Sequence, residues 1–315
     1  MMKLCLVGVG AIAAVQHRPA ISDDPRFTLA ATVSRNNSLP SVENFKSIDE
    51  TLEAMPEVKG AVLCVPPSVR HAYARKALDA GLHVFLEKPP GLTVGEVDDL
   101  KERAIRKGVT LFASWHSRYA PAVDTLRQHL AKSPAHRVVV SWREDVRVFH
   151  PGQQWIWEPG GFGVFDPGIN AFSILTHILP PPLRALRSDL FVPENRAQPI
   201  RAELALQDGS DTPVECVFDF DQPDPPTWDI IAETDAGTFR LAKGGAQLFR
   251  GDETLIDEPE REYPRLYERF AELCERGESD VDTAPLRLAA DCFLAARTAK
   301  VAAFNEDVPA VGSSR

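Results

Sequence analysis

The chain has 315 residues, which corresponds to about two domains at ~150 residues per domain. Hydrophobic residues make up 44% and charged residues 25%, a globular composition that excludes a disordered or collagen-like chain. The net charge of −10 disfavours a nucleic-acid binder, which needs a basic face.

The sequence also lacks the patterns of a membrane or secreted protein and of a disulfide or zinc framework. Apolar runs such as residues 60–66 are much shorter than the ~20 residues of a membrane span, and the N-terminus shows no signal-peptide pattern. The five cysteines are scattered without a C-x-x-C pair, which indicates neither a disulfide framework nor a zinc site. We therefore expect a cytoplasmic protein with no membrane, nucleic-acid or metal partner.

In the first third of the chain, short apolar runs alternate with helical patterns. The predicted strands are residues 4–8, 27–33, 60–65, 83–86 and 110–113. The predicted helices are residues 12–21, 48–54, 68–80 and 94–107. This alternation predicts a parallel sheet covered by helices on both faces, the α/β Rossmann arrangement.

The pattern changes after residue 117. A helix over 121–131 and a strand over 136–144 precede a loop rich in Pro, Gly and Trp (149–163) and a helix to about 179. Strands broken by turns follow to residue 249, and helices over 264–276 and 284–304 close the chain. We predict a dinucleotide-binding domain over 1–117 and an α+β domain over 118–315, with a large, open, mostly antiparallel sheet. Whether the C-terminal helix packs back on the first domain stays open.

The first predicted strand runs into a G-x-G-x-x-A turn that opens a helix. Gly8 permits the tight turn, Gly10 lets the backbone approach a pyrophosphate, and Ala13 lets the helix pack closely. The next backbone N–H groups, from Ala11 and Ile12, would face the phosphates. The alternative is an ordinary strand-to-helix turn, but the following βα units favour NAD(P) binding.

The end of the second predicted strand selects the dinucleotide. Sites that prefer NAD usually place an acid there, whereas this chain has Ser34 and Arg35. Both side chains can donate to a 2′-phosphate, which predicts that NADP is preferred or accepted alongside NAD. The alternative is that Arg35 is only a solvated loop residue.

Three more stretches carry polar or rigid residues. Two of them follow predicted strands, where ligands of such sheets bind, and the third lies in the second domain. They are Pro66-Pro67 with His71, Glu87-Lys88-Pro89-Pro90, and Gly160-Gly161 followed by Asp166-Pro167-Gly168-Ile169-Asn170.

Together these stretches resemble the Gfo/Idh/MocA family of NAD(P)-dependent sugar oxidoreductases, over nearly the whole chain. Trp115-His116-Ser117-Arg118 and the run from Trp155 to Gly161 are similar to the bacterial aldose 1-dehydrogenases, which act on L-arabinose and D-galactose. The resemblance implies that Lys88, Asp166 and Asn170 form the catalytic group and that the Lys88–Pro89 bond is cis. Because they follow strands of such a sheet, Pro66, Pro67, Glu87 and Lys88 are expected to contact the cofactor, and His71 is either a cofactor-side or a loop residue.

The chain departs from many relatives at Asn170, where they carry the histidine commonly taken as the proton acceptor. Asparagine cannot accept a proton near neutral pH, so the base is expected to be Asp166, alone or paired with Lys88. If Asp166 and Asn170 lie at the start of one helix, their spacing of four residues places them on the same face of that helix. The competing interpretation is that Asp166 and Pro167 are simply an N-cap and N1 pair.

Sugar contacts are expected from His116, His150, Gln154 and Trp155 in addition to Lys88, Asp166 and Asn170, although a core role is open for His116 and Trp155. The predicted reaction is oxidation of C1 of a pyranose to its lactone. The alternatives are another sugar or inositol dehydrogenase (D-xylose, D-glucose or myo-inositol) and a catalytically silent NADP-binding regulator. An uncovered sheet face in the second domain predicts a homodimer.

Overall fold

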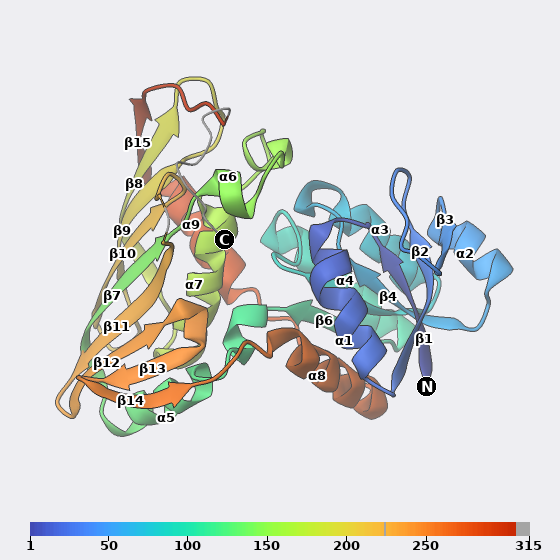
Figure 1. Ribbon diagram of the computed structural model, residues 1–315, viewed down its shortest axis with the longest axis horizontal. Helices are drawn as coiled ribbons and strands as arrows, with labels where there is room; N and C mark the ends of the chain where they lie inside the picture. The colour runs from blue at the N-terminus through green and yellow to red at the C-terminus, as the bar shows by residue number, and fades with distance from the viewer. Residues whose placement is uncertain (224, 307–315) are drawn as a thin grey trace. The chain divides into compact units, whose positions relative to one another are not determined.

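The computed structural model describes residues 1–223 and 225–306 (Figure 1). The chain divides into two compact units, one formed by residues 1–119 with 261–283 and the other by 120–260 with the segment from 284 onward. This division corrects the expected boundary after residue 117, because the segment 261–283 returns to the first unit.

The first unit contains a six-stranded parallel sheet in the order β3-β2-β1-β4-β5-β6. This is the strand order of a dinucleotide-binding fold, in which the order reverses beside β1. Its strands are β1 (Met2–Val7), β2 (Phe27–Val33), β3 (Glu43–Phe45), β4 (Val58–Leu63), β5 (His83–Glu87) and β6 (Leu111–Ser114).

Helices cover both faces of this sheet, as the continuous apolar strands require. The segment after β1 contains a π-helical turn, a feature that often marks functional sites. The helical elements are the π-helix η1 (Ala13–His17), α1 (Arg18–Asp23), α2 (Ile48–Ala54), α3 (Pro67–Asp79), α4 (Val94–Lys107), the 3₁₀-helix η2 (His116–Tyr119) and α8 (Glu262–Arg276).

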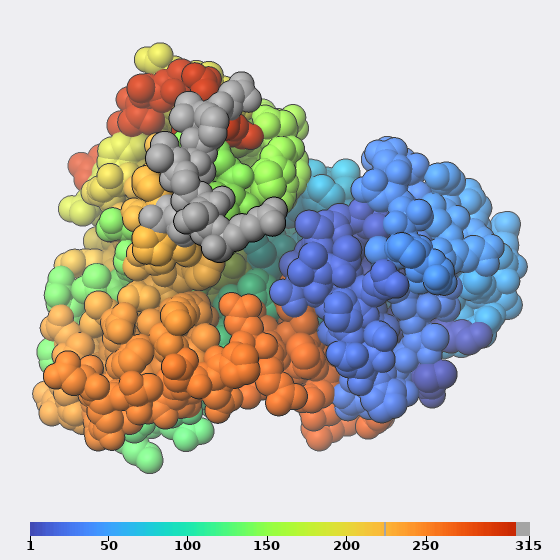
Figure 2. All heavy atoms as spheres, viewed as in Figure 1, coloured from blue at the N-terminus to red at the C-terminus, as the bar shows by residue number. Residues whose placement is uncertain are grey.

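Helix α8 explains why the late segment belongs to the first unit. Leu4 and Leu6 of β1 share an apolar cluster with α1 and α8, whereas Cys5 and Val7 point into the cluster beneath α2, α3 and α4. Tyr267 of α8 stacks on Phe85 of β5, with ring centroids 5.1 Å apart. Helix α8 lies beside α1 and so completes one layer of the sheet (Figures 1 and 2).

The second unit is built on a nine-stranded sheet in the order β14-β13-β12-β11-β7-β10-β9-β8-β15. Neighbouring strands are antiparallel except for the pairs β7–β10 and β8–β15. Its strands are β7 (Ala135–Arg143), β8 (Arg184–Pro193), β9 (Arg201–Gln207), β10 (Pro213–Asp219), β11 (Thr227–Thr234), β12 (Gly237–Ala242), β13 (Gln247–Arg250), β14 (Glu253–Asp257) and β15 (Ala296–Val301).

Among the described residues of the second unit, helices cover one face of this sheet and none covers the other (Figure 1). Buried and partly buried residues alternate along β7, β9 and β10, as expected for a sheet packed on one side. The helical elements are α5 (Val123–Lys132), α6 (Val146–Phe149), α7 (Phe165–Ile178) and α9 (Ala284–Leu294), with the short 3₁₀-helices η3 (Gln154–Ile156) and η4 (Lys243–Gly245).

The prediction of a final helix over 284–304 is wrong in its second half. Helix α9 ends at Leu294, and residues 296–301 form β15, which pairs in parallel with β8 at the edge of the sheet. Within the part of the chain that the structure describes, no helix has the length and apolarity of a membrane span.

Candidate active site

The turn after β1 has the geometry that the G-x-G pattern predicts. Gly8 has a φ of +91°, and a Cβ there would lie 2.8 Å from Val65 Cγ1 and 2.9 Å from the Val65 backbone nitrogen, so a side chain would be strained and crowded. A Cβ on Gly10 would meet nothing within 4 Å. The backbone at Gly10 is therefore open to a close-lying ligand such as a pyrophosphate.

A pocket of about 610 Å³ lies beside this turn, at the carboxyl ends of β1 and β2. Its lining includes Gly10 and Ala11 from the turn, Arg18 from α1, and Asn36 and Asn37 from the loop after β2. The Asn37 amide donates to the Val9 carbonyl at 2.8 Å and so ties the two loops together. These features fit a dinucleotide, whose phosphates and adenosine need such a cradle between the first two strands.

The predicted cofactor residues meet this pocket in part. Gly10 and Ala11 line it, whereas Ile12, Ser34 and Arg35 are outside its lining. The Ser34 hydroxyl accepts a hydrogen bond from the Asn37 backbone N–H at 3.2 Å, and Arg35 is exposed. Arg18 and Asn36 were missed by sequence reasoning, because no spacing rule connects them to the strand end.

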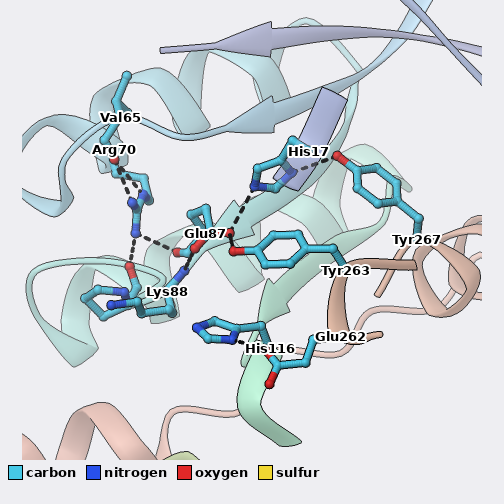
Figure 3. A network of polar contacts seen from close by, with 10 residues as sticks. His17, Val65, Arg70, Glu87, Lys88, His116, Glu262, Tyr263 and Tyr267 are labelled. Atoms are coloured by element: carbon cyan, nitrogen blue, oxygen red, sulfur yellow. Dashed lines mark hydrogen bonds and ion pairs between the residues drawn. The ribbon is translucent and has the colours of Figure 1, made fainter. Parts of the chain in front are cut away.

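Glu87, at the end of β5, is the centre of a buried polar network (Figure 3). Its Oε1 lies 3.0 Å from His17 Nε2 and accepts a hydrogen bond from the Tyr263 hydroxyl at 2.8 Å. Its Oε2 accepts from the Lys88 backbone N–H at 2.9 Å. This carboxylate was expected at the cofactor, but the structure buries it among protein groups.

The charge on Glu87 is stabilised despite its burial. Burial by itself raises the pKa of this carboxyl, but the hydrogen bond and charge of His17, the charge of His116 and the Tyr263 hydroxyl together lower the pKa to about 2. Glu87 is therefore a carboxylate throughout the range in which proteins function, and it acts as a hydrogen-bond acceptor.

Arg70 binds the backbone around Lys88 from the side opposite His17 (Figure 3). This buried guanidinium donates to the Val65 carbonyl through Nη2 at 2.6 Å, and through Nη1 to the carbonyls of Glu87, at 2.6 Å, and Pro89. The Lys88–Pro89 peptide bond is cis, as the family resemblance implies. Lys88 itself is half-buried at the carboxyl end of β5.

His116 follows β6, and its Nδ1 forms a hydrogen bond with Glu262 at the start of α8. Its ring stacks on Tyr263 at 5.8 Å between centroids. Burial lowers the pKa of His116, but the charge of Glu262 and the hydrogen bond to it, helped by the charge of Glu87, outweigh burial and raise the pKa. His116 is thus an imidazole whose pKa is raised by two carboxylates, in the same unit as Lys88.

The residues after β4 are placed differently from one another. Pro66 and Pro67 start α3 at the carboxyl end of β4, as predicted. His71, however, lies one turn further on, and its Nε2 contacts Asp99 Oδ2 of α4 at 2.9 Å. The structure therefore gives His71 a helix–helix contact, which weakens its expected role at the cofactor.

In the second unit, Asp166 and Asn170 lie one turn apart at the start of α7, as their spacing predicts. Asp166 is 4% exposed. The N-cap of α7 is Val164, which places Asp166 inside the first turn and corrects the interpretation of Asp166 and Pro167 as a cap pair. Asp166 is therefore a buried carboxylate within the first turn of α7 and is not its N-cap.

His150 connects Asp166 to a second buried carboxylate. Its Nδ1 lies 3.7 Å from Asp166 Oδ2, and its Nε2 lies 2.9 Å from Glu144 Oε1. The other oxygen of Glu144 accepts from the Trp228 indole N–H at 2.9 Å. Glu144 and Trp228 were not predicted, because they follow β7 and begin β11 with no motif around them.

Gln154 and Trp155 lie in η3. The Gln154 amide donates to Glu306 at 3.1 Å and accepts from Arg196 at 3.2 Å, so both of its ends already contact charged protein groups. Trp155 is half-buried, whereas its neighbour Trp157 is buried and donates to Glu306 at 2.8 Å. Among residues 1–223 and 225–306, no three His, Cys, Asp or Glu side chains group as metal ligands do.

A parallel sheet in this order, a G-x-G turn beside an open pocket and a half-buried lysine after β5 define a nicotinamide-cofactor oxidoreductase. The family model described as an oxidoreductase family with an NAD-binding Rossmann fold (Gfo/Idh/MocA) matches residues 2–114. A galactose 1-dehydrogenase from Pseudomonas fluorescens is 42% identical over 305 residues, which cover 97% of this chain and 99% of that protein. The chain belongs to the Gfo/Idh/MocA family.

Solved structures agree over the whole length. The crystal structure of a D-galactose-1-dehydrogenase protein from Rhizobium etli superposes with a TM-score of 0.92 and 49% identity, covering 96% of this chain and 98% of that one. A 3-ketoreductase from Actinomadura kijaniata, solved with NADP and TDP-benzene, superposes with a TM-score of 0.83 at 16% identity, covering 95% and 99%. The second likeness shows the shared fold.

Proposed function

We propose that the protein is an NAD(P)-dependent aldose 1-dehydrogenase that oxidises C1 of a pyranose of the D-galactose or L-arabinose type to the aldonolactone. The observation that carries this proposal is the 42–49% identity to galactose 1-dehydrogenases over nearly the full chain. Lys88 and Asp166 stand in the motifs that carry the family resemblance, and Asn170 stands where many relatives carry a histidine.

In this proposal the bound nicotinamide supplies the hydride acceptor, and the chain supplies proton transfer and orientation. Asp166 takes the proton of the C1 hydroxyl as general base. Lys88 donates to that oxygen and stabilises the charge that develops on it. Asn170 orients the ring by hydrogen bonds, since its amide cannot serve as the base.

The contacts of the second unit support a sugar subsite around Asp166. His150 lies beside Asp166 and contacts Glu144 on its other side, and both are polar and largely buried, which suits them to hold hydroxyl groups. Trp155 is proposed to cover an apolar face of the sugar. His116 is proposed to form a hydrogen bond with a sugar hydroxyl. Gln154 has the weakest support, because Arg196 and Glu306 already engage its amide.

NADP is the proposed preferred cofactor, with NAD also accepted. Ser34 and Arg35 follow β2 with no acidic residue, and Arg18 is a cation in the lining of the pocket. Arg35→Ala is expected to raise the KM for NADP⁺ about 10–100-fold, the value of a charged hydrogen bond, with little change for NAD⁺. Equal losses with both cofactors would contradict a contact with the 2′-phosphate.

We further propose a cytoplasmic homodimer that uses the uncovered face of the nine-stranded sheet. Val139 of β7 and Ile231 of β11 are paired on this face and are only partly buried. Light scattering during gel filtration tests the dimer, and Ile231→Glu is expected to shift it to monomer.

The first experiment follows the absorbance of reduced cofactor with D-galactose, L-arabinose, D-xylose, D-glucose and myo-inositol, each with NADP⁺ and NAD⁺. Fast reduction with the first two sugars supports the proposal, and Lys88→Ala is expected to abolish it in a folded protein. Faster turnover with myo-inositol would instead indicate oxidation of a ring carbinol. Cofactor binding without reduction of any kind would indicate a silent regulator.

A further inference from the structure

We propose that His17 is a positioning residue for Lys88, acting through Glu87, so that the first turn after the dinucleotide loop also sets the geometry of the lysine. This rests on the proposed function, in which Lys88 contacts the reacting oxygen. His17 has no place in the sequence motifs, and it is fully buried in the π-helix η1.

The hydrogen bonds fix the roles of the ring nitrogens. Glu87 is a carboxylate and can only accept, so His17 Nε2 must carry a proton toward Oε1. The Tyr267 hydroxyl lies 2.8 Å from Nδ1 and is the partner of the second ring nitrogen. Both ring nitrogens are thus held, and a chain of hydrogen bonds runs from α8 through His17 to Glu87.

The end of this chain is the backbone of Lys88. Glu87 Oε2 accepts from the Lys88 N–H at 2.9 Å, while Arg70 holds the carbonyls of Glu87 and Pro89 (Figure 3). The peptide groups on both sides of Lys88 are thus held from two directions. Such a clamp fixes the direction in which the lysine side chain leaves the strand end.

Glu87 can hold this position only while it stays charged and well partnered. The titratable groups that face it are His17 from η1, Tyr263 and Tyr267 from α8, His116 from η2, Cys64 after β4 and its neighbour Lys88. His17 contributes both a hydrogen bond and a charge interaction, more than any other group, to keeping the carboxylate ionised. Losing it would leave a buried acceptor short of a donor and free to turn.

Two substitutions of His17 separate this role from simple packing. His17→Leu fills the space without a donor, whereas His17→Gln keeps an N–H near the position of Nε2. His83→Leu is the matched control, because His83 accepts a hydrogen bond from the Thr110 N–H at the opposite end of the same strand. Each variant is checked for its unfolding midpoint and its affinity for NADP⁺.

We expect His17→Leu to lower kcat about 10–100-fold, the effect of a misplacement near 1 Å, while KM for the sugar and the affinity for NADP⁺ change little. His17→Gln should recover most of kcat. Hydrogen exchange at the Lys88 amide, measured without substrate or cofactor, should speed up in His17→Leu and not in His83→Leu.

Wild-type kcat and unchanged Lys88 exchange in a folded His17→Leu protein would overturn the proposal. Equal losses of kcat in His17→Leu and His83→Leu would also overturn it, since that result assigns the effect to stability. If the wild-type protein oxidises no aldose, the proposed function fails by itself. The exchange rate of the Lys88 amide then still decides whether His17 positions this turn.

Discussion

Asp166 shows how burial and helix position combine at a single residue. The carboxylate lies inside the first turn of α7, where the helix dipole favours a negative charge, and His150 Nδ1 lies 3.7 Å from it. Val164, and not Asp166, is the N-cap of this helix. A buried acid with a histidine beside it is a candidate for a chemical role.

Asp166→Asn tests this role. We expect kcat with D-galactose to fall about 10²–10⁴-fold, the usual contribution of a general base, because the amide keeps the shape and cannot take a proton. Asp124→Asn in the first turn of α5 is the control and should keep the wild-type rate. Comparable rates for the two variants in a steady-state assay would remove Asp166 from the mechanism.

Among the elements, α7 depends on one close approach to the sheet. A Cβ on Gly168 would lie 2.5 Å from Phe218 Cδ2, and Phe218 is a fully buried ring of β10. The glycine therefore lets the helix that carries Asp166 and Asn170 pack directly on the sheet. Its place in the Asp-Pro-Gly motif has a packing explanation.

Gly168→Ala is expected to destabilise the protein by about 1–3 kcal/mol through overpacking, and to lower kcat because Asp166 moves with the helix. Gly95→Ala, near the start of α4, is the control. Its Cβ would meet only Thr93 Oγ1 at 4.0 Å, so stability should stay equal or rise by up to ~1 kcal/mol. Urea unfolding of both variants measures the difference, and equal midpoints would contradict the packing argument.

At the scale of the whole molecule, the buried charge of Glu87 makes the stability of the fold depend on pH. Its pKa of about 2 lies below the ordinary value of a glutamate, so the carboxylate stabilises the fold fully above that ordinary value. The stabilisation, roughly 3 kcal/mol from the size of the shift, is lost as pH falls from about 5 toward 2.

Glu87→Gln should therefore be less stable than the wild type at pH 7, and its stability should fall less steeply between pH 5 and 2. Denaturant midpoints at a series of pH values give both slopes. The exposed Glu253→Gln serves as the control and should follow the wild-type slope. A Glu87→Gln slope as steep as that of the wild type would assign acid sensitivity to other carboxyls.

The local pattern of the chain predicts much of this molecule. Helix α4 is found at residues 94–107, as its caps at Thr93 and Gly108 indicate, and the parallel sheet follows from the alternation of apolar runs and helices. Strand β15 was missed because its residues show no alternation and are compatible with a helix. Its pairing with β8, a contact distant in sequence, decides the structure.

The candidate site also has a part that the sequence predicts and a part that it does not. Lys88 and the Asp166–Asn170 pair stand in short motifs that a family resemblance identifies. The network around Glu87 does not, since His17 is 70 residues and Tyr263 176 residues away from it along the chain. No periodicity or spacing encodes such contacts, because the tertiary fold alone brings those side chains together.

The late position of helix α8 in the chain has a consequence for folding during translation. Tyr263 is made 176 residues after Glu87, a delay of roughly 10–35 s at common rates of translation. During that time a nascent first unit has β5 and β6 without the layer that covers them. The apolar surface that α8 covers in the finished fold is then open, and the turn that carries Lys88 gains its full set of partners only near the end of synthesis.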